Sequence, residues 1–329
     1  MFSLIHLACK FEGQLTTNFL MSQILFLASL QIILKTLWMW YNRDNLLKLL
    51  DKTKSLYTDC ENEEICVIAE INLKKLSNFW IVCFKIASAS VYITCVLLAI
   101  CNALKGEDGI LITIPFIPIN FRGYLEFRLL IQTTLIGFGC VSVIYIDLMI
   151  VFFGIEIMAA SNILFDYISL HKDAIQEYPD DLKIITERFC KLVDNIKLFN
   201  SVISFSSFLQ FITSAFLSFS AFFIIRLCPE NPIGYFTCFC IVIQLFLPCF
   251  FGEFIKIRLE RLSTTLYLTN WYDLKLKDQK SFLIILGMIQ KEYGLKAAGL
   301  YDINIYTFIQ IMKMAVSWCA FIFTLHTYS

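Results

Sequence analysis

The chain has 329 residues, of which 58% are hydrophobic and 16% are charged, with 27 basic and 27 acidic side chains. A typical soluble domain is only about 45–50% apolar and about 25% charged, so this composition excludes an ordinary soluble protein. The balanced charge also argues against nucleic-acid binding. The mean hydropathy of the whole chain is high, at +0.70. We therefore expect an all-α polytopic membrane protein that contacts membrane lipid and no nucleic acid.

Six apolar stretches are long enough to cross a bilayer as helices, which takes about 20 residues. Segment 1–17 precedes them and lacks the basic start and the cleavage site of a signal peptide. The first span ends in Trp38 and Trp40, and such aromatic residues are typical of the membrane interface. The six predicted spans are 18–40, 76–102, 128–156, 199–226, 234–255 and 304–325.

The distribution of positive charge between these spans predicts the orientation of the chain. Nineteen of the 27 Lys and Arg residues lie in three long polar segments, 41–75, 157–198 and 256–302. Only five lie in the alternate segments, 1–17, 103–128 and 226–233. Cytoplasmic segments carry the excess of Lys and Arg, so we expect the three long segments inside the cell and both termini outside.

Segment 256–302 is predicted to be a cytoplasmic helical anchor. Apolar side chains recur in it at helical spacing and therefore need burial, although a solvated linker is the alternative. These side chains are Phe282, Leu283, Ile285, Leu286 and Ile289. The chain is thus divided into membrane helices with the ligand-binding region (1–255), the anchor (256–302) and a terminal helix (303–329).

The last span carries a polar stripe. Gln310, Ser317 and Thr324 are seven residues apart, so they share one narrow face of a helix, while the opposite face is apolar. Such a stripe either packs against neighbouring helices or lines water. Lys313, beside the stripe, favours a cavity, a partner or the membrane interface.

No arrangement of residues predicts catalysis, a metal site or a cofactor. Most of the 13 cysteines lie in apolar runs, the three histidines are far apart and no glycine-rich phosphate loop is present. Of the acidic groups at membrane depth, Glu156 and Glu253 lie near cytoplasmic ends and are expected to snorkel to the interface or to pair with Lys or Arg there. Asp147 lies deeper, and a proton relay is disfavoured because no histidine or second carboxylate accompanies it. We therefore expect no catalytic residue, no metal, no cofactor and no enzyme activity.

The outer halves of the middle spans combine aromatic rings with single hydroxyls. This mixture is typical of a pocket for a mostly apolar ligand that one or two hydrogen bonds orient. The alternative is ordinary contact between helices. The predicted ligand-binding residues are Tyr92, Thr133, Phe138, Thr213, Phe216, Tyr235 and Phe239.

The carboxyl-terminal third resembles the insect odorant receptor family. The resemblance rests on Gly252-Glu253-Phe254, Leu262, Tyr267, Trp271, the run Lys296-Ala297-Ala298-Gly299-Leu300-Tyr301, and Tyr306-Thr307-Phe308 followed by Ile311-Met312-Lys313. One departure is Leu259, where the family usually has serine. The family has seven spans and a cytoplasmic amino terminus, and this chain begins just before what corresponds to the second span.

The resemblance implies the odorant-binding tuning subunit of an odour-gated, non-selective cation channel. Such a subunit assembles with the odorant receptor co-receptor into a hetero-oligomer, expected to be a tetramer, through its cytoplasmic helices. The resemblance also implies a plasma-membrane location in the dendrite of an olfactory neuron. It further implies that the ligand is a small volatile or apolar odorant. When the family's pore-lining positions are transferred to this sequence, Gln310, Ser317 and Thr324 would line the pore. Phe321 or Leu325 would narrow its outer end.

Three other functions are less consistent with the sequence. A G-protein-coupled receptor fits an outside amino terminus, but not six spans with an outside carboxyl terminus, and its usual sequence landmarks are absent. A gustatory receptor of the sister family would end in a different motif from Thr324-Leu325-His326. A secondary transporter is disfavoured because no internal repeat is visible.

Overall fold

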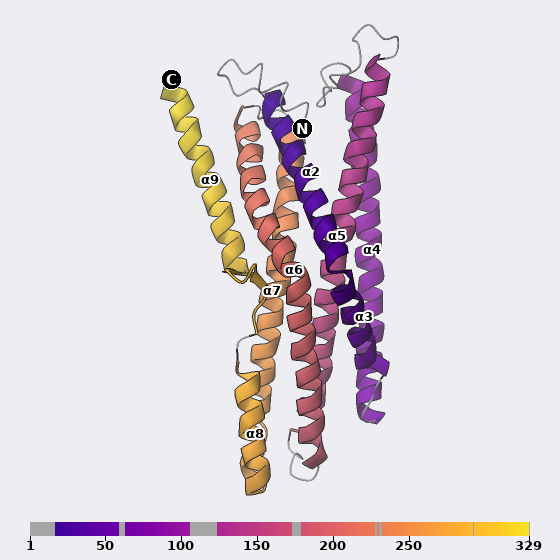
Figure 1. Ribbon diagram of the computed structural model, residues 1–329, viewed down its shortest axis with the longest axis vertical. Helices are drawn as coiled ribbons and strands as arrows, with labels where there is room; N and C mark the ends of the chain where they lie inside the picture. Colours follow the sequence, from indigo (N-terminus) through magenta and orange to yellow (C-terminus); the bar gives the residue numbers. More distant parts are fainter. Residues whose placement is uncertain are drawn as a thin grey trace.

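Long helices make up most of the computed structural model (Figure 1). The structure describes residues 17–58, 63–105, 124–172, 179–227, 229, 232–291 and 293–328. The helices are α2 (Thr17–Tyr41), α3 (Arg43–Thr58), α4 (Glu63–Lys105), α5 (Tyr124–Leu170), α6 (Pro179–Leu227), α7 (Pro232–Tyr267), the short η2 (Trp271–Asp273), α8 (Leu276–Ile289) and α9 (Ile305–Tyr328). Between α8 and α9, strands β1 (Lys296–Ala297) and β2 (Tyr301–Asp302) form a hairpin. The predicted all-α membrane architecture is confirmed.

Three helices are much longer than a bilayer is thick. Helices α4, α5 and α6 contain 43, 47 and 49 residues, so each is about 65–75 Å long at 1.5 Å per residue. The hydrocarbon core of a bilayer is about 30 Å thick, so each helix must continue well beyond it. Helix α6 begins at Pro179, a residue that suits the first helical position because its missing N–H is not needed there.

Five of the six predicted spans lie inside one helix each, in the order α2, α4, α5, α6 and α7, and the sixth lies in α9 except for Asn304, which precedes that helix. Four helical segments of the described chain are long and apolar enough to cross a membrane: Gln23–Tyr41, Leu129–Leu170, Leu182–Leu227 and Gly234–Tyr267. The described apolar part of α9, Ile305–Phe321, is shorter. Residues 1–16 and most of the predicted loop 103–128 lie outside the described residues.

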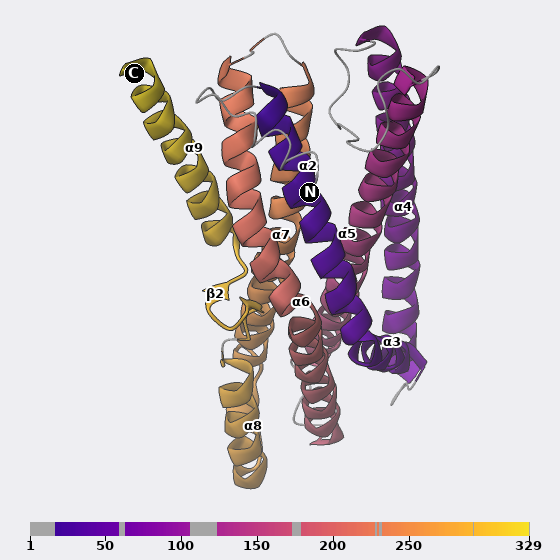
Figure 2. The same ribbon diagram turned by 45° about the horizontal axis from the view of Figure 1, so that its top comes forward.

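Helices α6 and α7 connect the terminal helix to the rest of the bundle. Helix α5 packs against α4 and α7, whereas α6 packs against α2, α7 and α9. In Figures 1 and 2, α4 and α5 lie on one side of the bundle and α9 on the other. The carboxyl end of α9 leans away from the bundle in both views. Helix α9 therefore contacts the rest of the bundle mainly through α6 and α7.

The segment predicted as a cytoplasmic anchor is packed rather than loose. Phe282, Ile285, Leu286 and Ile289 of α8 are buried, and the ring of Trp271 stacks on Phe282 at 5.5 Å with an interplanar angle of 7°. The predicted packing is confirmed for these four residues. Leu283 is the exception at 50% exposure, because it lies on the side of α8 that faces away from α7. The division of the chain into three regions stays a prediction.

Candidate functional site

Helix α9 has one buried face and one exposed face. Ile311, Ala315 and Cys319 are buried and lie four residues apart, so they form one strip along the helix. Helix α9 packs against α6 and α7, and this strip is its buried face. The small Ala315 side chain, with no measurable exposure, allows close approach of the neighbouring helix.

The predicted polar stripe lies on the exposed part of α9. Gln310, Ser317 and Thr324 are all exposed, and Phe321 is 63% exposed. The side chain of Leu325 lies outside the described part of the structure. The stripe is therefore not buried against helices of its own chain, and it is available to water or to another subunit. Its role in lining a pore stays a prediction.

The seven predicted ligand-binding residues lie on four helices and in two kinds of environment. Tyr92 of α4, Phe138 of α5, and Tyr235 and Phe239 of α7 each expose half or more of their surface, so they lie at the surface of the bundle. Thr213 of α6 is buried, with only 5% exposure. The structure does not gather the first four around Thr213 in a common core.

The remaining two positions make contacts that the sequence did not indicate. The hydroxyl of Thr133 donates a hydrogen bond to the Leu129 carbonyl at 2.8 Å, within its own helix. The ring of Phe216 on α6 lies 6.1 Å from that of Trp318 on α9. Phe216 therefore connects the predicted ligand-binding region to the predicted pore helix, whether or not it touches a ligand.

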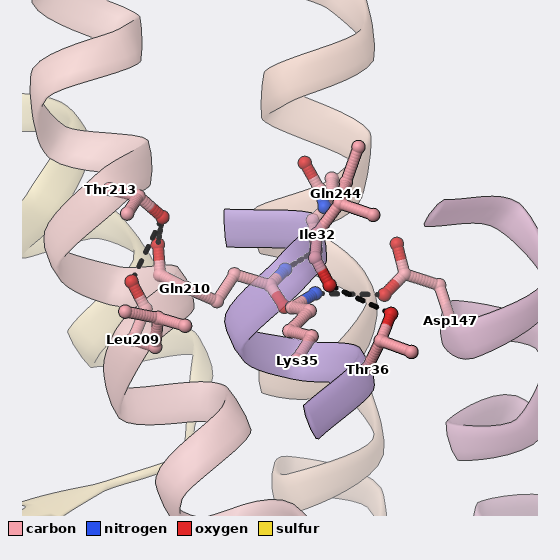
Figure 3. A network of polar contacts seen from close by, with 8 residues as sticks. All are labelled: Ile32, Lys35, Thr36, Asp147, Leu209, Gln210, Thr213 and Gln244. Atoms are coloured by element: carbon pink, nitrogen blue, oxygen red, sulfur yellow. Dashed lines mark hydrogen bonds and ion pairs between the residues drawn. The ribbon is translucent and has the colours of Figure 1, made fainter. Parts of the chain in front are cut away.

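A charged network that the sequence does not predict lies inside the membrane part of the bundle. Lys35 of α2 places its Nζ 3.1 Å from Oδ1 of Asp147 on α5 and donates to Oε1 of Gln210 on α6 at 2.7 Å (Figure 3). The side-chain amide of Gln210 donates in turn to the main-chain carbonyl of Gln244 on α7. The side chains of Lys35 and Asp147 are 1% and 13% exposed. Four helices are thus joined through one buried ammonium and one carboxylate.

This network has a physical reason. An isolated charge in hydrocarbon is costly, so charged groups within a membrane are paired with each other or with polar groups. The side chains of Ser206, Ser207 and Ser214, which lie within about 60° of Gln210 on the helical wheel, are also buried. Helix α6 therefore carries several buried polar side chains on the face that bears Gln210. The sequence signal was the presence of one basic and one acidic residue deep in two different spans.

Other chemistry is limited in the part of the chain that the structure describes. No three His, Cys, Asp or Glu side chains among the described residues come together as a metal site. A cavity of about 220 Å³ lies near the end of α8 and is lined by Lys256, Leu259, Glu260, Ser263, Thr264, Ile289, Gln290, Lys291 and Tyr293. It lies in the predicted cytoplasmic region, away from the predicted ligand-binding residues.

Comparison with known proteins identifies the family. A family model described as 7tm Odorant receptor matches residues 15–316. Odorant receptor 33b of Drosophila melanogaster is 26% identical over 132 residues, which are 39% of this chain and 35% of that protein. Odorant receptor 33c of the same species is 31% identical over 80 residues, 23% of this chain and 21% of that protein. The aligned part of the chain thus spans about a third or less of these relatives.

The fold matches solved receptors as well. The olfactory receptor OR5 from Machilis hrabei in complex with eugenol gives a TM-score of 0.74 at 14% identity, covering 98% of this chain and 84% of that one. The same receptor described without eugenol gives 0.63 at 12% identity, covering 98% and 83%. At such low identity these matches show the fold alone. Because the family model covers most of the sequence, the chain belongs to the seven-transmembrane odorant receptor family.

Proposed function

We propose that this chain is the odorant-binding tuning subunit of a ligand-gated, non-selective cation channel. It assembles with the odorant receptor co-receptor into a hetero-oligomer, expected to be a tetramer, in the plasma membrane of the olfactory neuron dendrite. Its ligand is a small volatile or apolar odorant. The observation that carries this proposal is the exposed stripe of Gln310, Ser317 and Thr324 on α9.

The stripe supports an ion path for a physical reason. Hydrocarbon offers no hydrogen-bond partner, so an exposed amide in the membrane needs water or another subunit beside it. If α9 helices of several subunits face a common axis, their stripes line an aqueous path. Phe321, which is 63% exposed, would narrow that path towards its outer end and close it by excluding water.

The choice of an apolar odorant rests on residue chemistry and on one solved relative. Tyr92, Phe138, Tyr235 and Phe239 offer aromatic surface, and Thr133 and Thr213 offer hydroxyl groups. The Machilis hrabei receptor was solved with eugenol, a small aromatic molecule. Eugenol is therefore a sensible first member of any odorant panel.

The proposal is tested by recording odour-evoked current from cells that express this chain with the co-receptor. The recording is repeated while G-protein signalling is blocked. Current that persists supports a channel that the ligand opens directly. Current that disappears under the block favours a G-protein-coupled receptor and contradicts the channel.

Replacing Ser317 with valine is expected to lower the single-channel conductance, because it substitutes an apolar group for a hydroxyl on the proposed ion path. The rank order of odorants should stay the same, since Ser317 lies on α9 rather than among the proposed pocket residues. The matched control is Ser29→Val on α2, where the exposed hydroxyl bonds the Leu25 carbonyl of its own helix at 2.6 Å. An altered odorant ranking with unchanged conductance would reassign the stripe to ligand binding.

An apolar surface on α8 supports assembly with other subunits. Leu283, Ile284 and Met288 are 50%, 67% and 38% exposed on this predicted cytoplasmic helix. Neighbouring apolar side chains exposed outside the membrane mark a protein-binding surface. This surface is opposite the buried residues of α8, so it remains available after the subunit has folded.

Replacing Ile284 with serine is expected to weaken assembly. Burial of an isoleucine side chain contributes about 1.5–3 kcal/mol, so association should weaken roughly tenfold to a hundredfold. The measurement is the fraction of co-receptor that co-purifies with the tagged chain in detergent. The control is Lys277→Ser, which removes an exposed polar side chain from the same helix. Equal co-purification of Ile284→Ser and the unmodified chain would exclude this surface from the interface.

A further inference from the structure

The hairpin that leads into α9 is held in a defined conformation. We call residues 295–304 the connector. Within it, Ala297 pairs with Tyr301, and the amide of Ile303 donates to the Leu295 carbonyl at 2.8 Å. Ala298 and Gly299 both have positive φ, at 50° and 72°, as the tight turn of a hairpin requires. The connector lies where α7, α8 and α9 meet (Figure 2).

One side of the connector is bonded to α6. The amide of Lys296 donates to Oδ1 of Asn200 at 2.7 Å. The amide of Ala298 donates to the main-chain carbonyl of Ser204 at 3.2 Å. Asn200 and Ser204 are one helical turn apart, so the first strand follows the surface of α6 over that turn.

The other side of the connector is fitted against α7. The main-chain oxygen of Ile303 lies so close to Gly252 that a Cβ added to this glycine would be 1.8 Å away from it. The next residue on α7, Glu253, accepts a hydrogen bond from the amide of Ile305 through Oε2 at 3.4 Å. This carboxylate lies at the amino end of α9, where a negative charge is favourable.

Hydrogen bonds join the connector to the first turn of α9. Oδ1 of Asn304 accepts a hydrogen bond from the amide of Thr307 at 2.8 Å, as an N-cap residue does. The hydroxyl of Thr307 donates back to the carbonyl of Asp302 at 2.7 Å. The second strand and the first turn of α9 therefore move as one piece.

We propose that the connector transmits displacements of α6 and α7 to α9, with Asn200, Gly252 and Glu253 as its positioning residues. This inference rests on the proposed channel function and adds a route from the ligand-binding helices to the pore helix. The geometry amplifies small movements. Phe321 lies about 24 Å along the helix axis from Ile305, so a tilt of about 5° at the base moves Phe321 by about 2 Å.

Asn200 is the residue at which this idea is best tested. Asn200→Ala removes the acceptor for the Lys296 amide, whereas Asn200→Asp keeps an oxygen in that place. The control is the neighbouring Ser201→Ala, because the exposed Ser201 hydroxyl donates to the Leu198 carbonyl of its own helix at 2.7 Å. One hydrogen bond of typical strength changes an equilibrium by about threefold to tenfold.

Two measurements are made on the full chain in complex with the co-receptor. Hydrogen exchange of the amides in residues 305–312 should rise by about threefold to tenfold in Asn200→Ala. The spontaneous open probability in single-channel recordings, made without odorant, should change by a similar factor while the conductance stays constant. Asn200→Asp and Ser201→Ala should match the unmodified chain in both.

The outcomes separate the two proposals. Unchanged exchange in α9 overturns the connector's hold on that helix. Faster exchange with an unchanged open probability shows a purely structural contact and overturns the coupling. An unmodified complex that carries no current overturns the channel itself, and the exchange experiment then still decides whether Asn200 holds α9.

Discussion

Replacing Lys35 with methionine is expected to lower the free energy of unfolding by about 3–5 kcal/mol, the usual cost of leaving a buried charge without its partner. The Asp147 carboxylate, only 13% exposed, would lose the ammonium group 3.1 Å away. Gln210 would lose the donor to its side-chain oxygen at the same time. The measurement is the thermal unfolding midpoint of the purified complex in detergent, together with the fraction of the chain at the cell surface.

Two further variants identify why Lys35→Met lowers the free energy of unfolding. The double substitution Lys35→Met with Asp147→Asn removes both charges and keeps similar volumes, so most of the stability should return. Lys85→Met, at an exposed position on α4, should have little effect. If the double variant is no more stable than Lys35→Met alone, charge pairing is not what Lys35 contributes.

Features that depend on one helix could be predicted from the sequence. The seven-residue spacing of Gln310, Ser317 and Thr324 places them on one face of any regular helix, and the structure has them all exposed. The same reasoning predicted burial for Phe282 and Ile285 on α8. The polar side of α9 is therefore indicated by the sequence, whereas α8 carries apolar residues on both sides, and Leu283, predicted to be buried, is 50% exposed.

Contacts between distant segments could not be predicted in this way. Lys35 and Asp147 are 112 residues apart, and each was visible only as a charge inside an apolar span. Gly252 belonged to the motif that indicated the family, but nothing local showed that Ile303 approaches it. Pairings of this kind depend on which helices are neighbours, and helical periodicity carries no information about neighbours.

The predicted ligand-binding residues lie on identified helices, but the sequence does not show which side of each helix faces the bundle. Helices α5 and α7 are apolar on nearly all sides, so periodicity does not tell which side faces the bundle. Residue type and depth alone predict Phe138 and Phe239 as ligand contacts, and both are more than 60% exposed in the single chain. The same two criteria predict Phe216, whose ring lies 6.1 Å from that of Trp318 on α9. Individual positions in the pocket therefore stay predictions.

Replacing Gly252 with alanine is expected to destabilise the protein by about 1–3 kcal/mol or more, because the added methyl group overfills a packed contact. The new Cβ would lie 1.8 Å from the main-chain oxygen of Ile303 and 2.8 Å from its carbonyl carbon. These are backbone atoms, so trimming the side chain with Ile303→Ala should not restore stability. The measurement is the unfolding midpoint of the purified complex.

Gly287→Ala provides the matched comparison, because it is not expected to destabilise the protein. Gly287 lies inside α8, and a Cβ added there meets nothing within 4 Å. Alanine is favoured over glycine within a helix by about 1 kcal/mol, so this variant should unfold at the same or a higher temperature. The two substitutions are chemically identical, but Gly252 is buried against the backbone of Ile303, whereas Gly287 is exposed. If Gly252→Ala is as stable as Gly287→Ala, the backbone of the connector is not held against α7.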